Sequence, residues 1–219
     1  MDLTNLLTLN HKLPDMPPEF GTYIGFIKAP LEQLTDAMTK WRKELDNSPK
    51  ATHLPGGLKE NAHHLLPIQL QPQLREILIA TPSPWTAYFN SLQSGDISGP
   101  VAVMGRKLGV DGVVICSTPF QKEPGAIGQK LGGLTFEYRT QTFNRSIALI
   151  EGETSSSRYH FETWGPIQDW EQNEHYTNRY KRKRFTPEIL QTYARHLDID
   201  PFNLDYYNGP TTLIQRTKF

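Results

Sequence analysis

Polar residues on two expected strands have the side chains that acid–base catalysis needs. Glu137 and Arg139 alternate with apolar residues in one strand, and Arg158, His160 and Glu162 do so in another. Carboxylates beside an imidazole can transfer protons, which suits a hydrolase in which Glu137, His160 and Glu162 act as acid and base. The same side chains can form cross-strand ion pairs worth about 0.2–1 kcal/mol each on a solvated sheet face. Nothing in the sequence places them in a dry pocket, so we favour the ion pairs.

Other catalytic and ligand-binding motifs are incomplete. The chain has no GxSxG motif, and Cys116 lies in an apolar run where its thiolate is disfavoured. His53, His63 and His64 cluster in an irregular stretch, but no cysteine or HExxH pattern completes a zinc site. The glycine-rich residues 125–133 precede a strand rather than a helix, so no helix N-terminus can receive a phosphate. We therefore expect neither a metal nor a cofactor.

A basic run surrounds one tyrosine near the end of the chain. Its members are Arg179, Tyr180, Lys181, Arg182, Lys183 and Arg184. Such a run can bind phosphates, and the tyrosine ring can stack on a base. However, residues 151–175 carry many acids against Arg158 alone, and an acidic stretch beside a basic one is typical of a solvated face. Nucleic-acid binding is therefore the weaker interpretation of this run.

The acidic stretch also contains aromatic residues that could anchor a protein partner. The candidate contacts are Glu151, Glu153, Glu162, Trp164, Trp170, Glu171 and Glu174. Aromatic anchors surrounded by charged residues are typical of protein interfaces. An equally weighted alternative is that both tryptophans pack inside the fold, because tryptophan is often partly buried.

The composition is that of a folded chain without a strong overall charge. Lysine and arginine total 23, aspartate and glutamate total 23, and 37% of the 219 residues are hydrophobic. The balanced charge gives no long-range attraction to nucleic acid or to an anionic membrane. A single cysteine excludes an intrachain disulfide, and the N-terminus lacks the basic residues of a signal peptide. We expect a cytoplasmic protein without a membrane segment, and the oligomeric state stays open.

The length and the apolar periodicity predict a single α+β domain over residues 1–219. The elements expected in the first half are an extended arm at 1–20, a strand at 23–27, a helix at 31–45, a hairpin at 74–90 and a helix at 100–107. The irregular residues 46–73 are long for a loop in a compact domain. They either hide a short helix or form a functional insertion.

The second half of the chain predicts a meander of strands followed by a helix. The strands are expected at 113–117, 134–139, 146–151 and 158–163, and the helix begins after Thr186 and ends before Pro201. Alternating polar and apolar residues in these strands indicate a sheet with one wet face. We therefore expect a largely antiparallel sheet, a meander of about six strands, with two to four helices packed on one face.

Several short stretches resemble a group of uncharacterised bacterial α+β proteins. They are Trp85-Thr86-Ala87-Tyr88-Phe89, Arg145-Ser146-Ile147, Tyr176-x-x-Arg179 and Arg184-Phe185-Thr186-Pro187-Glu188-x-Leu190. Proteins of this kind are similar in type to the immunity proteins that bacteria keep beside polymorphic toxins. The resemblance implies a protein that acts by binding another protein, and it carries over no catalytic residue.

Together these patterns favour a non-enzymatic protein-binding module, most concretely an immunity or antitoxin-type protein that occludes the active site of a toxin. Such inhibition needs complementary charge and a few aromatic anchors rather than a catalytic constellation. Two alternatives stay open: a hydrolase that uses Glu137, His160 and Glu162, and a nucleic-acid binder that uses residues 179–184.

Overall fold

The structure is a computed structural model that describes six parts of the chain. They are residues 23–45, 48–66, 74–91, 97–118, 132–152 and 159–216. The extended arm expected at 1–20 lies outside the described residues, as do Glu153 and Arg158.

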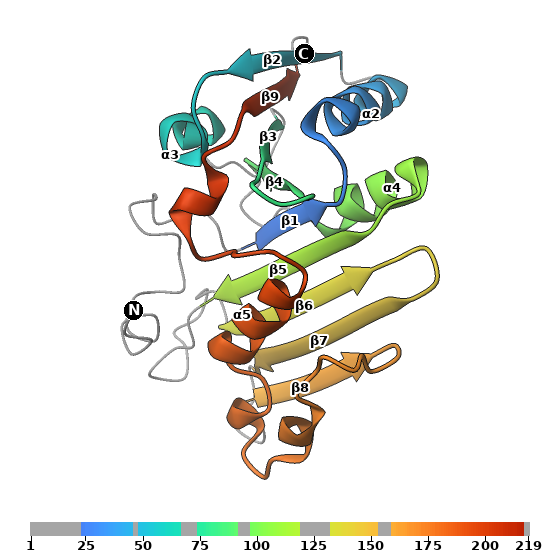
Figure 1. Cartoon of the computed structure of the whole chain (residues 1–219), viewed down its shortest axis with the longest axis vertical. Coiled ribbons are helices and arrows are strands. Elements are labelled where there is room, and N and C mark those ends of the chain that lie inside the picture. The colour runs from blue at the N-terminus through green and yellow to red at the C-terminus, as the bar shows by residue number, and fades with distance from the viewer. Residues whose placement is uncertain are drawn as a thin grey trace.

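The described strands form one antiparallel sheet (Figure 1). Within these residues it has nine strands in the order β2-β9-β3-β4-β1-β5-β6-β7-β8. In chain order they are β1 (Tyr23–Ile27), β2 (Pro49–Leu54), β3 (Arg75–Ala80), β4 (Thr86–Asn90), β5 (Gly112–Thr118), β6 (Gly133–Arg139), β7 (Asn144–Glu151), β8 (Tyr159–Trp164) and β9 (Thr211–Arg216). The predicted α+β class, the hairpin β3–β4 and the meander β5 to β8 are thereby confirmed.

The sheet has nine strands rather than the predicted six or so, and β2 and β9 are the two that were not among the strands expected along the chain. Strand β2 lies at the start of the irregular residues 46–73, where lysine, threonine and histidine obscure any apolar alternation. Within the described part of the chain it is an edge strand whose one neighbour is β9, so a partly polar sequence suffices there. Strand β9 comes after all other elements and enters the sheet between β2 and β3.

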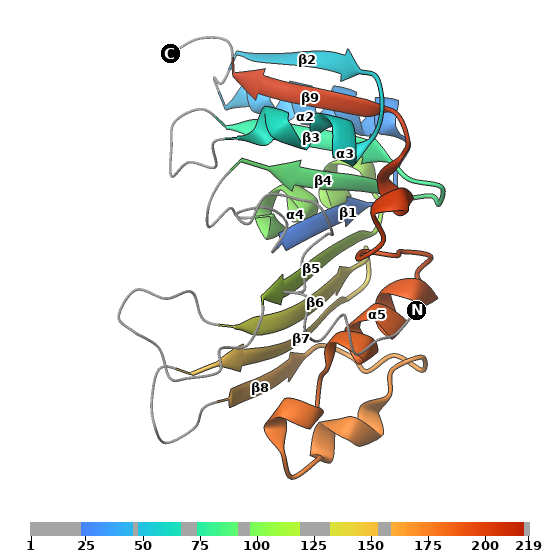
Figure 2. The same cartoon turned by 90° about the vertical axis from the view of Figure 1, so that its left-hand side faces the viewer.

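Helices pack on both faces of the sheet rather than on one, as Figure 2 shows. The described α-helices are α2 (Leu31–Glu44), α3 (Leu58–Asn61), α4 (Ser98–Leu108) and α5 (Pro187–His196). Four short 3₁₀ helices accompany them: η1 (Ala62–Leu65), η2 (Asn173–Thr177), η3 (Lys181–Lys183) and η4 (Leu204–Tyr207). The expectation of a single helical face was wrong because the central strands are apolar on both sides: Ile77 and Leu78 face different clusters. None of the described helices is long and apolar enough to cross a membrane.

Helices α2 and α4 cover the first face. Leu34 and Met38 of α2 are fully buried in a cluster with Val101 and Met104 of α4. Helix α4 lies so close to β1 that a Cβ added at Gly25 would stand 2.7 Å from a methyl group of Val101. The pair of helices is thus fixed over β2, β9, β3, β4, β1 and β5.

Helix α5 packs on the opposite face, behind the meander. Thr186 caps it by accepting a hydrogen bond from the Ile189 amide at 3.4 Å, and Pro187 occupies its first turn. Leu190 and Tyr193 are fully buried in the larger cluster, which also contains the inward side chains of β6 and β7. This cluster fills one side of the meander.

Candidate functional site

One face of the strands β6, β7 and β8 is left uncovered by the described helices. On this side of the sheet α2 packs against β2, β3 and β9, and α4 packs against β1 and β5. We term the remaining surface the open face. Its side chains are Thr135, Glu137, Arg139, Ser146, Ala148, Ile150, His160, Glu162 and Trp164, all half-buried or exposed.

Strand pairing arranges the open face in rows that run from β6 through β7 to β8. The rows are Glu137, Ser146 and Trp164; then Thr135, Ala148 and Glu162; then Gly133, Ile150 and His160. In the first two rows the central strand carries a small side chain between larger ones. Ser146 and Ala148 are therefore smaller than their neighbours on β6 and β8, whereas in the third row the large side chain, Ile150, lies on β7 itself.

Two large apolar side chains of the open face are exposed to solvent. Trp164 is 65% exposed and Ile150 is 44% exposed. They lie on neighbouring strands, and Glu162 stands between their rows. Exposed tryptophan residues beside charged side chains are typical of the anchors of protein interfaces.

The carboxylates of the open face differ in their contacts. Glu137 accepts a hydrogen bond from Ser98 Oγ at 3.0 Å and is paired with Arg139 Nη2 at 2.7 Å. Glu162 is exposed and forms no ion pair with any described residue. Among the described residues of the open face, the carboxylate without an ion pair is therefore Glu162, on β8.

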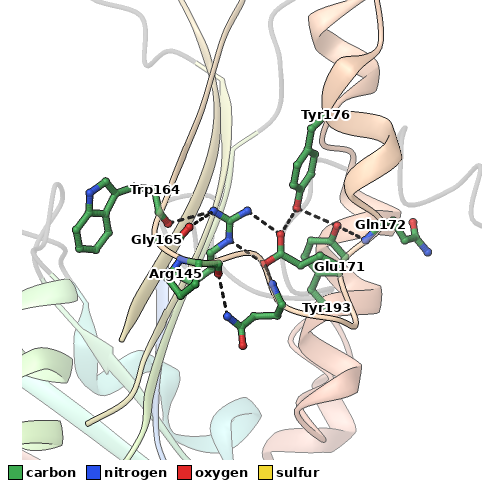
Figure 3. A network of polar contacts seen from close by, with 9 residues as sticks. Arg145, Trp164, Gly165, Glu171, Gln172, Tyr176 and Tyr193 are labelled. Atoms are coloured by element: carbon green, nitrogen blue, oxygen red, sulfur yellow. Dashed lines mark hydrogen bonds and ion pairs between the residues drawn. The ribbon is translucent and has the colours of Figure 1, made fainter. Parts of the chain in front are cut away.

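A buried ion pair behind the sheet fixes the backbone that carries Trp164 (Figure 3). Arg145 Nε and Nη2 donate to the two oxygens of Glu171 at 2.8 and 2.7 Å. Arg145 Nη1 donates to the carbonyl oxygens of Trp164 and Gly165 at 3.2 and 3.1 Å. The ring of Trp164 lies on the side of the strands away from Glu171. The buried pair thus holds the end of β8 while the ring stays exposed.

Tyrosine hydroxyl groups complete this network. Tyr176 donates to Glu171 Oε2 at 2.7 Å and lies 3.0 Å from the hydroxyl of Tyr193, which accepts from the Gln172 amide. Burial, followed by the bonds to Tyr193 and Glu171, raises the pKa of Tyr176 far above its ordinary value. The Tyr176 hydroxyl is therefore a neutral donor that stabilises the Glu171 carboxylate, and Tyr193 holds Tyr176 in place.

The sequence-predicted partner contacts do not form one surface. Glu162 and Trp164 lie on the open face, and Glu174 is exposed on η2, 3.9 Å from His175. Glu151 is buried, and its carboxylate accepts the Gly132 amide at 2.8 Å. Glu153 is outside the described residues.

The remaining two predicted contacts, Trp170 and Glu171, serve the interior. Trp170 is half-buried, with its ring 5.2 Å from that of Tyr193 and stacked at 5.2 Å on His196. Glu171 is the buried partner of Arg145. Sequence reasoning did not select Ile150, although an isoleucine on the polar side of the predicted strand 146–151 was a signal for it.

The acid–base residues share a face but do not converge. Glu137 lies on β6, whereas His160 and Glu162 lie on β8, and β7 separates the two strands. Neighbouring strands are about 4.8 Å apart, so Glu137 stands about 10 Å across the sheet from the other two. Among the described residues, no hydrogen bond or ion pair joins Glu137 to His160 or Glu162; Glu137 is bound to Ser98 and Arg139 instead.

The other candidate ligands also lie apart. His53 Nδ1 contacts Thr212 Oγ1 at 3.1 Å, and the rings of His63 and His64 stack at 4.0 Å. Cys116 is buried, 3.8 Å from Thr118 Oγ1. Among the described residues, no three of His, Cys, Asp or Glu stand close enough together to hold a metal ion.

The basic run forms a corner around η3. Arg184 Nε donates to the Asn178 carbonyl at 2.8 Å, and Lys183 Nζ lies 5.6 Å from the centre of the Tyr180 ring, which is 61% exposed. Arg179 is exposed, and Lys181 and Arg182 belong to η3 itself. The buried acids of the preceding stretch, Glu151 and Glu171, are bound elsewhere and do not compensate this corner.

Comparisons of the chain with protein-family models, with curated proteins and with solved structures found no match.

Proposed function

We propose that this chain is a non-enzymatic protein-binding module that holds its partner on the open face. The observation that carries the proposal is the exposed Trp164, whose backbone is fixed by the buried Arg145 and whose ring is 65% exposed. An aromatic side chain on a rigid strand loses little conformational freedom when a partner covers it. Ile150 and Glu162 beside it supply apolar area and charge for the same contact.

The most concrete form of this proposal is an immunity protein that occludes the active site of a toxin. Three features support it: the resemblance in type to immunity proteins, the uncompensated carboxylate of Glu162, and the wide spacing of Glu137 from His160. An inhibitor of this kind covers its target by shape and charge, so it needs no catalytic group of its own.

Site-specific photo-crosslinking in the source organism tests the proposal. A photo-reactive amino acid replaces Trp164 in the full chain, and a second version carries it at Tyr180, an exposed aromatic residue between η2 and η3 that is not part of the open face. We expect one protein to crosslink at position 164 and not at position 180. Crosslinking of equal strength at both positions, or at neither, contradicts the proposal.

A growth assay tests the immunity form. The chain and the product of the neighbouring gene are expressed together and separately in a host that lacks both. We expect the neighbouring product alone to stop growth, the chain to restore it, and Trp164→Ala to remove the protection. If the product of the neighbouring gene does not stop growth, the immunity form is contradicted. The broader protein-binding proposal is then tested by the crosslinking experiment alone.

A second candidate function is nucleic-acid binding at the corner around η3. It is favoured by the exposed Arg179 and Tyr180, and by the engagement of Glu151 and Glu171 elsewhere. Filter binding of a single-stranded oligonucleotide at low salt tests it. If the corner binds phosphates, the affinity falls steeply with salt and Arg179→Glu weakens it. No retention of RNA or DNA at low salt removes this candidate.

A further inference from the structure

We infer that the open face receives an amphipathic helix of the partner, with a basic residue beside its apolar stripe. The inference rests on the proposed function, because it specifies the partner's side of that contact. On this side of the sheet, α2 and α4 already cover the strands from β2 to β5. Over the open face, on the same side of the sheet, the described residues place no helix.

The width of the open face matches one helix. Two strand spacings separate β6 from β8, which is about 10 Å, and a helix with its side chains is about 10–12 Å across. The small side chains Ser146 and Ala148 leave room for a helix along β7, and Ile150 on the same strand gives it an apolar contact. Glu137 lies beside Ser146 on β6 and Trp164 lies beside it on β8, so a helix laid along β7 contacts both.

An added strand fits this surface less well than a helix. A strand pairing with the edge of β8 would extend the sheet and leave the open face as bare as before. The apolar groups that need cover are Trp164 and Ile150, which the strand register puts on the open face rather than at its edge. Figure 3 shows the Trp164 ring standing out to one side of the strands. Only an element lying on the face removes both from water.

The charges of the open face specify a basic helix. Arg139 is already paired with Glu137 at 2.7 Å, so the charge of Glu137 on β6 is compensated. Glu162, on β8, forms no ion pair with a described residue. A second copy that met this surface with its own open face would bring another Glu162 against the first, and the two like charges would repel, so we take the partner to be a different protein.

Two synthetic helical peptides test this inference on the full chain. Each has about 18 residues, or about five turns, with the same leucine and alanine stripe, and the flanking residues are lysine in one and glutamate in the other. Fluorescence anisotropy of labelled peptides measures their binding. We expect the lysine peptide to bind at least about 10-fold more tightly, and Glu162→Lys to reverse this preference.

Matched variants localise the binding. Trp164→Ala should weaken the lysine peptide by about 10-fold or more, whereas Tyr180→Ala should leave its affinity unchanged. Equal affinity for the two peptides, no binding of either, or binding insensitive to Trp164→Ala overturns the inference. So does a dimer of the chain that Trp164→Ala dissociates.

The partner segment crosslinked at position 164 separates the two proposals. A basic helical segment supports both. A crosslinked loop or strand overturns the helix inference and leaves the protein-binding function standing. If the lysine peptide binds but no protein crosslinks, the open face still binds a basic helix, and the evidence for a cellular partner is removed.

Discussion

At the scale of single residues, two tryptophans six positions apart have opposite roles. Trp164 carries its ring on the open face, whereas Trp170 packs among Phe136, Tyr138 and Tyr193. Both stand in the same acidic stretch, so composition could not separate them. The difference arises because β8 ends at Trp164, and the chain then turns behind the sheet toward α5.

The first prediction compares these two residues. Trp170→Ala should lower the free energy of unfolding by about 2–4 kcal/mol, because it leaves a cavity among aromatic rings. Trp164→Ala should change it by less than about 0.5 kcal/mol, because the ring is already in water. Urea denaturation of both variants measures the difference. Similar losses for the two would show that the Trp164 ring is structural after all.

A second prediction concerns the buried ion pair. Glu171→Ala leaves Arg145 charged and unpaired in a site where its side chain is 1% exposed, so we expect a loss of about 3–5 kcal/mol. Glu174→Ala, three residues along the chain and with a side chain 69% exposed, is the matched control and should cost under about 0.5 kcal/mol. The denaturation midpoints of the two variants measure this difference in stability. If the two lose equally little, the network does not hold the end of β8.

At the scale of elements, the helices and strands that could be predicted from the sequence are those with a clear local pattern of apolar residues or a helix cap. Helix α5 was recognisable from Thr186 and Pro187, and the meander from its alternation. The missed strand β2 carries Lys50 and His53, which follow no apolar period, and it becomes a strand only because β9 pairs with it. The same limit applied to the site: Glu171 is buried because Arg145, 26 positions earlier, lies opposite it.

The third prediction tests the packing of α4 on β1. Gly25→Ala would place a methyl group 2.7 Å from Val101 Cγ2 and 2.8 Å from Ile97 Cγ2, so the helix must move or the side chains must rotate. We expect a loss of about 1–3 kcal/mol, which is typical of overpacking. The double variant Gly25→Ala with Val101→Ala should recover part of it, because it removes the nearer methyl group. No recovery would place the strain elsewhere.

At the scale of the whole molecule, the chain joins elements from its two ends in one sheet. Strand β1 lies at the centre, and β9 lies between β2 and β3 (Figure 1). Pairing strands this far apart in sequence requires long-range contacts, which local patterns do not reveal. It also means that the described sheet is complete only when its last strand is in place.

The fourth prediction follows from that insertion. A chain ending at Pro210 loses the backbone partner of both β2 and β3 and the buried side chains of Leu213 and Ile214. Burying each of these side chains contributes about 1.5–3 kcal/mol. The lost strand pairing adds to that, and the total approaches the 5–15 kcal/mol by which domains are stable.

We therefore expect the chain ending at Pro210 to have no cooperative thermal transition, as measured by circular dichroism. The matched control removes only residues 217–219, which leaves β9 whole, and should melt cooperatively. If the short chain folds, the seven strands β3, β4, β1, β5, β6, β7 and β8 form a stable unit without β2 and β9. In that case β2 and β9 would be an addition to the sheet, and the open face could be studied on the shorter chain.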